Sequence, residues 1–335
     1  MEGTKKRIFR WGILGLGKIA HKFATDLQRL PNARLVAVAS TDVQRARVFA
    51  EQYGCEQAFG SYEELIQRAG VDVVYVATAH TGHYSSTMDC LRSGIPVLCE
   101  KPFAMNGQQA AEMAQLARER GVFLMEALWT LFIPGMEAVL EQVRSGVLGR
   151  IHSVKADFGF YAAYKADWRL FDPKLGGGAL LDVGIYPVLL AMLIFGPPLP
   201  SGIHTVGTRT RDGVDETCSF IFQYEGNGLA MGHATVAADT PVEAWIYGEK
   251  GQIHIQPRWH HPTTFTLQMH DGSDPEEFSF PYEGWGYHFE AAHVMDCLEA
   301  GKKESDRVPL EFSCTLSRTM DVMLAQMGVK YEGAC

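Results

Sequence analysis

The feature that most constrains the fold is a glycine-rich loop close to the start of the chain. An apolar stretch, residues 8–14, runs directly into the sequence GLGKIA of residues 15–20, and helix-forming sequence follows. In this GxGxxA spacing the first glycine permits a tight turn, the second lets backbone amides approach a phosphate, and the small last residue allows close helix packing. The position between a strand and a helix therefore indicates a dinucleotide-binding loop, formed by Gly15, Gly17, Lys18, Ile19 and Ala20.

Short apolar runs alternate with helix-length segments up to about residue 125, which is typical of βαβ units. We expect parallel strands at 8–14, 34–39, 71–76, 96–100 and 122–125. Successive βαβ units wind right-handed and leave a ligand-binding crevice at the carboxyl ends of the strands. Residues 1–127 are thus predicted to form an NAD(P)-binding Rossmann domain, with a doubly wound parallel sheet.

Beyond about residue 150 the apolar residues recur at every second position, which predicts half-buried strands. Such runs occupy 153–160, 217–224, 229–237, 243–248 and 251–256, with a helix expected over 178–195. Residues 128–335 are predicted to form an α+β domain for substrate binding and oligomerisation, with a large, mostly antiparallel, open-faced sheet. A further helix over 287–300 and the segment after it are expected to pack back on the Rossmann domain.

Charge and cysteine content restrict the partners and the compartment. The 30 Lys and Arg residues against 39 Asp and Glu residues give a net charge of −9, which disfavours nucleic acid and anionic membranes. The pattern predicts no secretion signal and no membrane-spanning stretch of ~20 apolar residues. The seven cysteines are an odd number without zinc-ligand spacing, which favours a reducing, cytoplasmic location.

The choice of cofactor is expected to depend on the end of the second strand, where NAD enzymes usually present a carboxylate to the ribose. Ser40 and Thr41 stand there, and Arg45 follows, so a 2′-phosphate would meet hydrogen-bond donors and a positive charge. Asp42 either caps the next helix or reaches the ribose and selects NAD. We favour NADP, with NAD as the alternative.

Two further motifs carry candidate catalytic groups. The fifth strand ends in Glu100-Lys101-Pro102, which delivers a lysine to the edge of the crevice, and an X-Pro bond is the one place where a cis peptide is affordable. A glycine run at 176–178 begins a helix in which Asp182 and Tyr186 stand at i and i+4, hence on one face. An adjacent ammonium group stabilises a tyrosine phenolate and lowers its pKa from ~10 toward neutral, as acid–base catalysis requires.

With these three motifs in this order, the chain resembles the glucose-fructose oxidoreductase and inositol dehydrogenase (Gfo/Idh/MocA) family. The resemblance extends over nearly the whole chain and is greatest to the subgroup of dimeric dihydrodiol and D-xylose NADP dehydrogenases. Tyr186 stands where most relatives carry histidine, and His80 stands where asparagine is usual; both are features of that subgroup. Leu131 departs from the arginine common in relatives, which removes a polar contact to substrate.

The resemblance implies further site residues. Cofactor contacts are implied for Thr78, Ala79, His80, His83, Glu100, Lys101, Trp168 and Arg169, and for Ser40 with Arg45. Trp129 and Phe158, with Tyr186, are implied to shape the substrate pocket. It also implies a homodimer, or a higher oligomer, formed through the open face of the C-terminal sheet.

The function predicted from these features is NADP-dependent hydride transfer between a secondary alcohol of a sugar, polyol or cyclic diol and the nicotinamide, with ketone reduction as the reverse. Tyr186 would exchange the proton, Lys101 would tune Tyr186, and Asp182 would orient the pair. The alternative is a non-catalytic dinucleotide-binding sensor. Such a protein would be expected to have lost its catalytic residues, whereas Lys101, Asp182 and Tyr186 are all present.

Three other patterns are set aside. Tyr161 and Lys165 have the YxxxK spacing of short-chain dehydrogenases but lack that family's opening loop. His288 and His293 are five residues apart and do not share a helical face, so no metal site is expected. The segment Trp259–His261 is interpreted as a solvated loop, with a loop at the lip of the substrate pocket as the alternative.

Overall fold

The computed structural model describes residues 7–331, and the chain divides into two compact units. Among the described residues, unit 1 consists of 7–104, Gln108–Trp129 and Glu283–Cys314. Unit 2 consists of Met105–Gly107, Thr130–Tyr282 and 315–331. Each unit contains its own β-sheet, and each is described here by itself.

The sheet of unit 1 has six strands in the order β3-β2-β1-β4-β5-β6, and every neighbouring pair is parallel. The strands are β1 (Phe9–Leu14), β2 (Ala33–Ala39), β3 (Gln57–Phe59), β4 (Val73–Val76), β5 (Val97–Glu100) and β6 (Leu124–Ala127). The chain moves outward from β1 to β3 and then returns to place β4 beside β1. A doubly wound sheet binds its ligands at this reversal, at the carboxyl ends of the strands.

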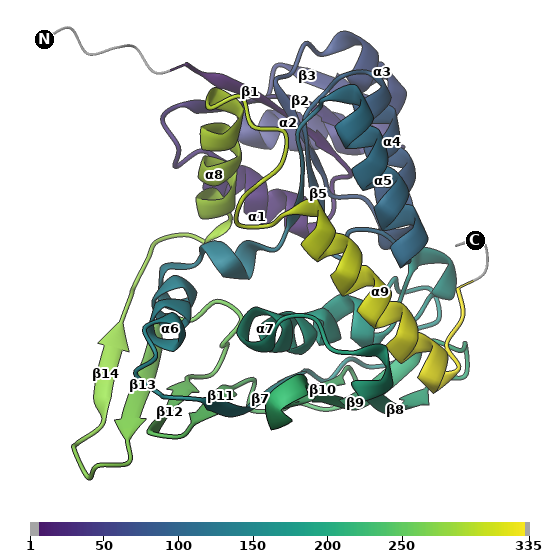
Figure 1. The fold of residues 1–335 in the computed structure, drawn as a ribbon. Helices are drawn as coiled ribbons and strands as arrows, with labels where there is room; N and C mark the ends of the chain where they lie inside the picture. Colours follow the sequence, from purple (N-terminus) through teal and green to yellow (C-terminus); the bar gives the residue numbers. More distant parts are fainter. Residues whose placement is uncertain (1–6, 332–335) are drawn as a thin grey trace, which may run out of the picture. The chain divides into compact units, whose positions relative to one another are not determined.

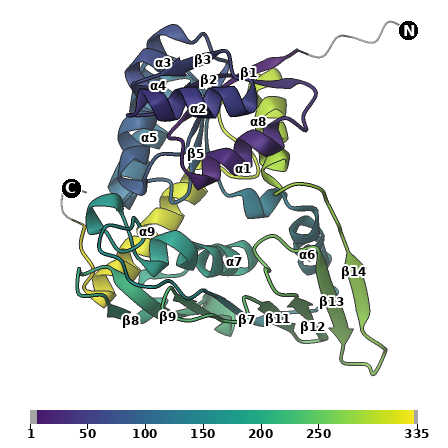
Figure 2. The ribbon, with the colours of Figure 1, turned by 180° about the vertical axis from the view of Figure 1, so that it is seen from behind.

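Helices cover both faces of this sheet. One face carries α1 (Lys18–Leu27) and α2 (Val43–Tyr53), and the other carries α3 (Tyr62–Arg68), α4 (His83–Arg92) and α5 (Gly107–Arg120) (Figures 1 and 2). Helix α8 (Tyr287–Glu299), far along the chain, lies beside α1. The strands are buried on both faces, which explains why they read as continuous apolar runs rather than as alternating ones.

Asp26 explains why α8 joins this unit. Its carboxylate is fully buried at the end of α1 and accepts hydrogen bonds from the backbone amides of Trp285 and Tyr287, at 2.9 Å each, and it contacts His288. The amides at a helix start have no partner within the helix, so a buried acceptor there fixes the start of α8. These contacts outweigh the burial of Asp26, so its pKa is lowered.

The sheet of unit 2 has eight strands in the order β14-β13-β12-β11-β7-β10-β9-β8. Among the described strands, β7 and β10 form a parallel pair and the other pairs are antiparallel. The strands are β7 (Ile151–Gly159), β8 (Ile203–Arg209), β9 (Asp215–Gln223), β10 (Leu229–Thr235), β11 (Ala244–Gly248), β12 (Gly251–Ile255), β13 (Thr264–Met269) and β14 (Glu276–Ser279).

One face of the unit 2 sheet packs against α6 (Pro134–Arg144) and α7 (Ile185–Phe195) (Figure 1). A π-helical turn, η4 (Leu180–Gly184), leads into α7. Helix α9 (Leu310–Met327) begins in unit 1 and continues into unit 2. The remaining short helices are η1 (His80–Gly82), η2 (Trp129–Phe132), η3 (Pro173–Leu175), η5 (Pro200–Gly202) and η6 (Glu225–Asn227).

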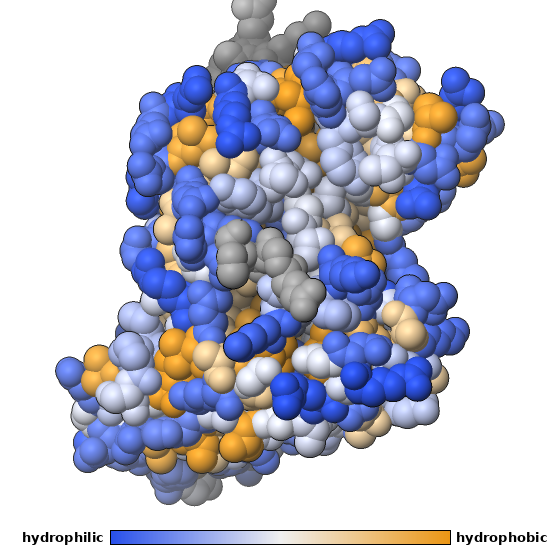
Figure 3. Space-filling view, turned by 90° about the vertical axis from the view of Figure 1, so that its right-hand side faces the viewer, coloured by the Kyte–Doolittle hydropathy of each residue, from blue (hydrophilic) through white to orange (hydrophobic). Residues whose placement is uncertain are grey.

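The other face of this sheet carries exposed apolar side chains. Ile221 pairs with Met231 across β9 and β10, and these side chains are 48% and 39% exposed. Val206 on β8 is 72% exposed. Figure 3 shows apolar side chains at the surface along the lower edge of the view, which looks from the side where β8 lies in Figure 1. The sheet is therefore covered on one face and open on the other.

The predicted fold class is confirmed: a parallel Rossmann sheet and a large, mostly antiparallel sheet are both present. The short edge strand β3 and strands β8, β13 and β14 were not expected from the sequence. The segment Pro173–Phe195 is long and apolar enough to span a membrane, which corrects the expectation that no stretch reaches that length. Burial of 78% of its apolar window inside the protein is typical of a core helix, so it is weak evidence for a span.

Candidate active site

The turn that carries Lys101 is held on both sides. Glu100 ends β5, the Lys101–Pro102 peptide bond is cis, and the chain then runs on to Phe103. The Nδ1 atom of His83 lies 2.7 Å from the carbonyl oxygen of Pro102, which can only accept, so the ring donates there. The amide of Phe103 donates to Oε1 of Glu126 at 2.9 Å. Residues from α4 and β6 therefore fix the backbone directly after Lys101.

Glu100 is fixed from the other side. Its Oε1 accepts a short hydrogen bond from the Tyr75 hydroxyl, and its Oε2 accepts from the Lys101 amide at 3.1 Å. Tyr75 is fully buried, and burial with the nearby Glu100 raises its pKa well above the usual value, which keeps its hydroxyl a donor. The Glu100 carboxylate is thus oriented before any ligand binds.

Two more buried carboxyl groups surround this turn. Glu290, on α8, is fully buried, and neither of its side-chain oxygens has a hydrogen-bond partner among the described residues. Burial, with a contribution from Glu100, raises its pKa well above the usual value. Burial likewise raises the pKa of Glu126 to about 8. Both shifts favour the neutral form, and sequence reasoning missed these groups because each takes its role from a distant contact.

The glycine loop has the shape that a dinucleotide requires. Gly15 has φ +87°, and a Cβ atom there would lie 2.6 Å from the carbonyl oxygen of Ala77. Gly17 is the N-cap of α1 and makes no side-chain cap, and a Cβ atom there would meet nothing within 4 Å. The amides at the start of α1 can therefore point toward a phosphate. Ala20 is fully buried, as the close packing of this helix demands.

The end of β2 shows how Asp42 is used. Its Oδ1 accepts from the amides of Gln44 and Arg45, at 2.9 and 3.3 Å, so Asp42 caps α2. Ser40 is buried, and its hydroxyl accepts from the Asp42 amide at 3.2 Å. Thr41 and Arg45 are exposed. Of the two roles expected for Asp42, the capping role is the one the contacts support.

The loop after β4 carries the remaining unit 1 candidates. Thr78 and Ala79 are half-buried and His80 is buried. The rings of His80 and His83 lie 5.7 Å apart, edge to face. Nε2 of His83 lies 3.3 Å from the Thr78 carbonyl oxygen, so His83 connects this loop to the Lys101 turn. Unit 1 thereby brings together the candidates at the carboxyl ends of β1, β4 and β5.

Trp129 belongs to a different structural unit from the other predicted substrate residues. It belongs to unit 1, where its ring stacks on Tyr287 of α8 with centroids 4.5 Å apart. Phe158 and Tyr186 belong to unit 2.

In unit 2, Tyr186 lies in an aromatic cluster. Its ring centroid is 5.5 Å from that of Phe158 and 5.2 Å from that of His260, and Phe158 stacks on His260 at 4.3 Å. Thr130 donates its hydroxyl to the His260 carbonyl at 2.7 Å. His260 is therefore a neighbour of the candidate residue Tyr186 that sequence reasoning did not place there, since only tertiary contacts bring the two together.

The loop that carries His260 is built into the core, so the prediction of a solvated loop at 259–261 is wrong. Trp259 is fully buried and donates its indole N–H to the carbonyl of Asp157 at 2.8 Å. The Asp157 carboxylate accepts from the Val242 amide at 2.8 Å, and the Val242 carbonyl accepts from the Arg258 amide at 2.8 Å. Val242 has φ +56°, a strained conformation for a β-branched residue. Strain of this kind persists only where several contacts enforce it.

Asp182 lies in the π-helical turn and forms an ion pair with Arg169, whose Nη2 is 2.7 Å from Oδ1. A π-helical turn has more residues than an α-helical one, so the i, i+4 reasoning that placed Asp182 and Tyr186 on one face does not apply unchanged. Trp168, beside Arg169, is 37% exposed and packs edge-on against Phe171. Two predicted residues, Arg169 and Asp182, are thus joined.

Comparison with known proteins agrees with this picture. Residues 9–128 match the oxidoreductase family with an NAD-binding Rossmann fold, and residues 136–254 match the GFO/IDH/MocA C-terminal domain. The trans-1,2-dihydrobenzene-1,2-diol dehydrogenase of Mus musculus is 39% identical over 332 residues, covering 96% of this chain and 98% of the mouse protein. The human enzyme of the same name is 36% identical over 333 residues, with coverage of 96% and 98%.

Among solved structures, a 3-ketoreductase from Actinomadura kijaniata, in complex with NADP and TDP-benzene, has a TM-score of 0.84 at 26% identity, and the match covers 96% of this chain and 98% of that one. The fold, the glycine loop and these matches define the protein as an NAD(P)-dependent oxidoreductase. More specifically, the chain belongs to the Gfo/Idh/MocA family, as the resemblance of its motifs predicted.

Proposed function

We propose that this enzyme oxidises a secondary alcohol of a sugar, polyol or cyclic diol with NADP⁺, and that it reduces the corresponding ketone in reverse. The observation that carries the proposal is the Lys101 turn at the carboxyl end of β5, which is fixed by His83 and Glu126. Two relatives named for a dihydrodiol support the substrate class. The nicotinamide, when bound, accepts or supplies the hydride.

The protein's own groups manage the proton. Tyr186 takes the hydroxyl proton at its phenolic oxygen, and Lys101 stabilises the phenolate and hydrogen-bonds the substrate oxygen. Asp182, paired with Arg169, orients this set. Phe158 and His260 surround the Tyr186 ring with flat faces that suit a ring-shaped substrate. The family resemblance also assigns Trp129 to substrate binding, and in unit 1 its ring stacks on Tyr287.

The test replaces Lys101 and Tyr186 singly, as Lys101→Met and Tyr186→Phe, with exposed Lys250→Met as the matched control. We expect turnover with diols, inositols and aldoses, followed by nicotinamide absorbance, to fall about 10²- to 10⁴-fold in the first two. NADPH binding, followed by fluorescence, should remain. Full turnover in Lys101→Met with intact cofactor binding would refute the assignment.

The preference for NADP over NAD rests on Ser40, Thr41 and Arg45. Because Asp42 is used as a helix cap, its carboxylate is directed to backbone amides. Arg45 is exposed at the start of the same helix and can form a charge-assisted hydrogen bond to a 2′-phosphate. Arg45→Ala should weaken NADPH binding about tenfold and leave NADH binding unchanged, whereas exposed Arg47→Ala should change neither. Equal loss for both cofactors would contradict this role.

The homodimer is proposed to form through the open face of the unit 2 sheet. Ile221 and Met231 pair on that face, and such apolar area on a sheet normally needs cover. Met231→Glu should convert a dimer into a monomer in sedimentation experiments. Val48→Glu, at an exposed apolar position in unit 1, is the control and should leave the dimer intact. A wild-type monomer would refute the proposal.

A cytoplasmic location is proposed from the cysteines. The six described cysteines are all free, and five of them are buried. Buried thiols without disulfide partners are typical of proteins from reducing compartments. Fractionation of cells that express the full chain tests this, and recovery in a secreted or membrane fraction would contradict it.

A further inference from the structure

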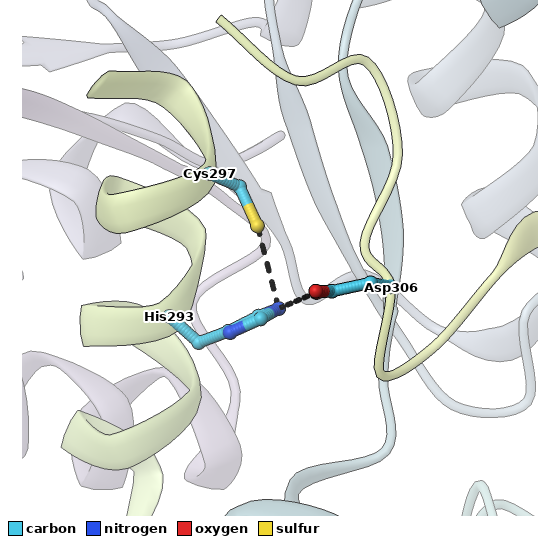
Figure 4. Close-up of side chains that lie close together, drawn as sticks. All are labelled: His293, Cys297 and Asp306. Carbon is cyan, nitrogen blue, oxygen red and sulfur yellow. Dashed lines mark hydrogen bonds and ion pairs between the residues drawn. The ribbon is translucent and has the colours of Figure 1, made fainter. Parts of the chain in front are cut away.

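A cluster of three metal-ligating side chains lies in unit 1, on the second half of α8 and the loop after it (Figure 4). His293 and Cys297 stand one helical turn apart on α8 and point toward Asp306 (Figure 4). Nε2 of His293 is 3.4 Å from the Cys297 sulfur and 3.9 Å from Oδ1 of Asp306. The three ligand atoms lie within 4.8 Å of one another.

The hydrogen bonds around His293 prepare its ring to act as a ligand. The Ser305 hydroxyl oxygen accepts from the amides of Arg307 and Val308, at 3.0 Å each, and lies 2.7 Å from Nε2 of His293. With both lone pairs used, the hydroxyl directs its proton to Nε2, which must therefore be the accepting nitrogen. This is the neutral tautomer that binds metals. Burial, with the nearby Arg307, also lowers the His293 pKa.

The distances suit a tetrahedral ion after one small movement. Zinc bound to sulfur at ~2.3 Å and to nitrogen at ~2.0 Å holds those two atoms about 3.5 Å apart, close to the 3.4 Å observed. Nitrogen and oxygen ligands would be about 3.3 Å apart, so Asp306 must approach by a few tenths of an ångström or more. Its side chain is 66% exposed and lies in the loop between α8 and α9, so it can turn.

We propose that His293, Cys297 and Asp306 bind one zinc ion, or a similar borderline-soft divalent cation, with water in the fourth position. A thiolate and an imidazole favour zinc over magnesium or calcium, which prefer oxygen ligands. Binding releases the Cys297 proton to solvent and replaces the Ser305 bond to His293. Lys302 contacts the other oxygen of Asp306, Oδ2, at 3.0 Å, so it does not occupy the ligand atom Oδ1. Cys297 is 2% exposed, so the ion enters from the Asp306 side.

This site departs from the prediction of no metal, which rested on the spacing of His288 and His293 and on the lack of zinc-ligand spacing among the cysteines. Residues five apart on a helix do not share a face, whereas His293 and Cys297 do. None of its three ligands is among the proposed catalytic residues. An ion here would connect the end of α8 to the loop at 302–306, whose Lys303 carbonyl accepts from the Leu124 amide at the start of β6.

The experiment uses the full chain, freed of metal with a chelator and titrated with Co²⁺ and then Zn²⁺. We expect one equivalent to bind, a thiolate-to-cobalt charge-transfer band that zinc abolishes, and a zinc-dependent rise in melting temperature. Cys297→Ser should remove the band, and Asp306→Ala should weaken zinc binding at least about tenfold. Cys55→Ser, at a half-buried thiol elsewhere, should leave all three readouts unchanged.

The outcomes separate this site from the proposed function, because none of these readouts depends on turnover. The band and the stoichiometry are measured on variants whose metal-free melting temperature equals that of the wild type. A charge-transfer band that persists in Cys297→Ser, or that disappears in Cys55→Ser, would overturn the proposal. So would the absence of any zinc-dependent change in the wild type.

Discussion

Replacement of Glu126 by glutamine should change the pH dependence of stability in a defined direction. Glu126 is fully buried on β6, where Oε1 accepts a hydrogen bond from the Phe103 amide. Burial raises its pKa from 4.5 to about 8. Glutamine keeps the accepting oxygen and the shape of the side chain, but it removes the titration.

The sign follows from the raised pKa. Below about pH 4.5 this carboxyl is protonated in both the folded and the unfolded chain, so it adds no pH dependence. Between pH 4.5 and about 8 the unfolded chain releases the proton and the folded chain retains it, so each pH unit lowers the free energy of unfolding by ~1.4 kcal/mol. The contribution levels off above about pH 8, after a total loss of about 5 kcal/mol.

The assay is urea unfolding followed by circular dichroism, for wild type and Glu126→Gln, at a series of pH values. From about pH 5.5 to about pH 8.5 the stability of the variant relative to the wild type should rise by about 3 kcal/mol. Exposed Glu299→Gln is the matched control and should show a constant difference. If the difference for Glu126→Gln is also constant, the carboxyl does not retain its proton and the reasoning is wrong.

The remaining predictions concern the glycine loop and the start of α8. Gly15→Ala should lower the melting temperature of the cofactor-free protein, because its Cβ would lie 2.6 Å from the Ala77 carbonyl oxygen. Gly17→Ala should keep that melting temperature and weaken NADPH binding at least about tenfold. If both variants had equal effects in both assays, the distinction between a structural Gly15 and a cofactor-binding Gly17 would be wrong. Asp26→Asn should cost about 3 kcal/mol at pH 7 in urea unfolding, since buried amides lose a charged acceptor. Because the Asp26 pKa is lowered, this wild-type advantage should fade as pH falls below about 3.8, and a pH-independent cost would refute the role of the charge.

The parts of the fold that sequence predicted are those with a local physical signal. The apolar runs of β1, β2, β4, β5 and β6 and the GxGxxA loop between β1 and α1 each depend on neighbouring residues, so pattern alone revealed them. Strand β3 has only three residues and lies at the sheet edge, and β13 and β14 follow a loop that pattern misassigned. The π-helical turn before α7 has no simple sequence signature.

The residues that surround the candidate catalytic groups could not be predicted from sequence in the same way. Glu290 looked like an ordinary helix residue between two histidines, and His260 looked like part of a surface loop. Their surroundings come from residues far away in sequence, such as Glu100 near Glu290 and Thr130, which donates to the His260 carbonyl. A polar residue in a regular element gives no sign of its burial until the tertiary fold is known.

The buried carboxyl groups near Lys101 also explain how its ammonium group can lie among acids and still be available to stabilise a phenolate. Three carboxyl groups, Glu100, Glu126 and Glu290, belong to its surroundings, and three full negative charges would compete for one ammonium group. Burial raises the pKa of both Glu126 and Glu290, which favours their neutral forms, and Glu126 also accepts a backbone hydrogen bond from Phe103. Above about pH 8 Glu126 ionises and brings a negative charge toward Lys101, which would hold the ammonium more tightly and weaken its stabilisation of a phenolate.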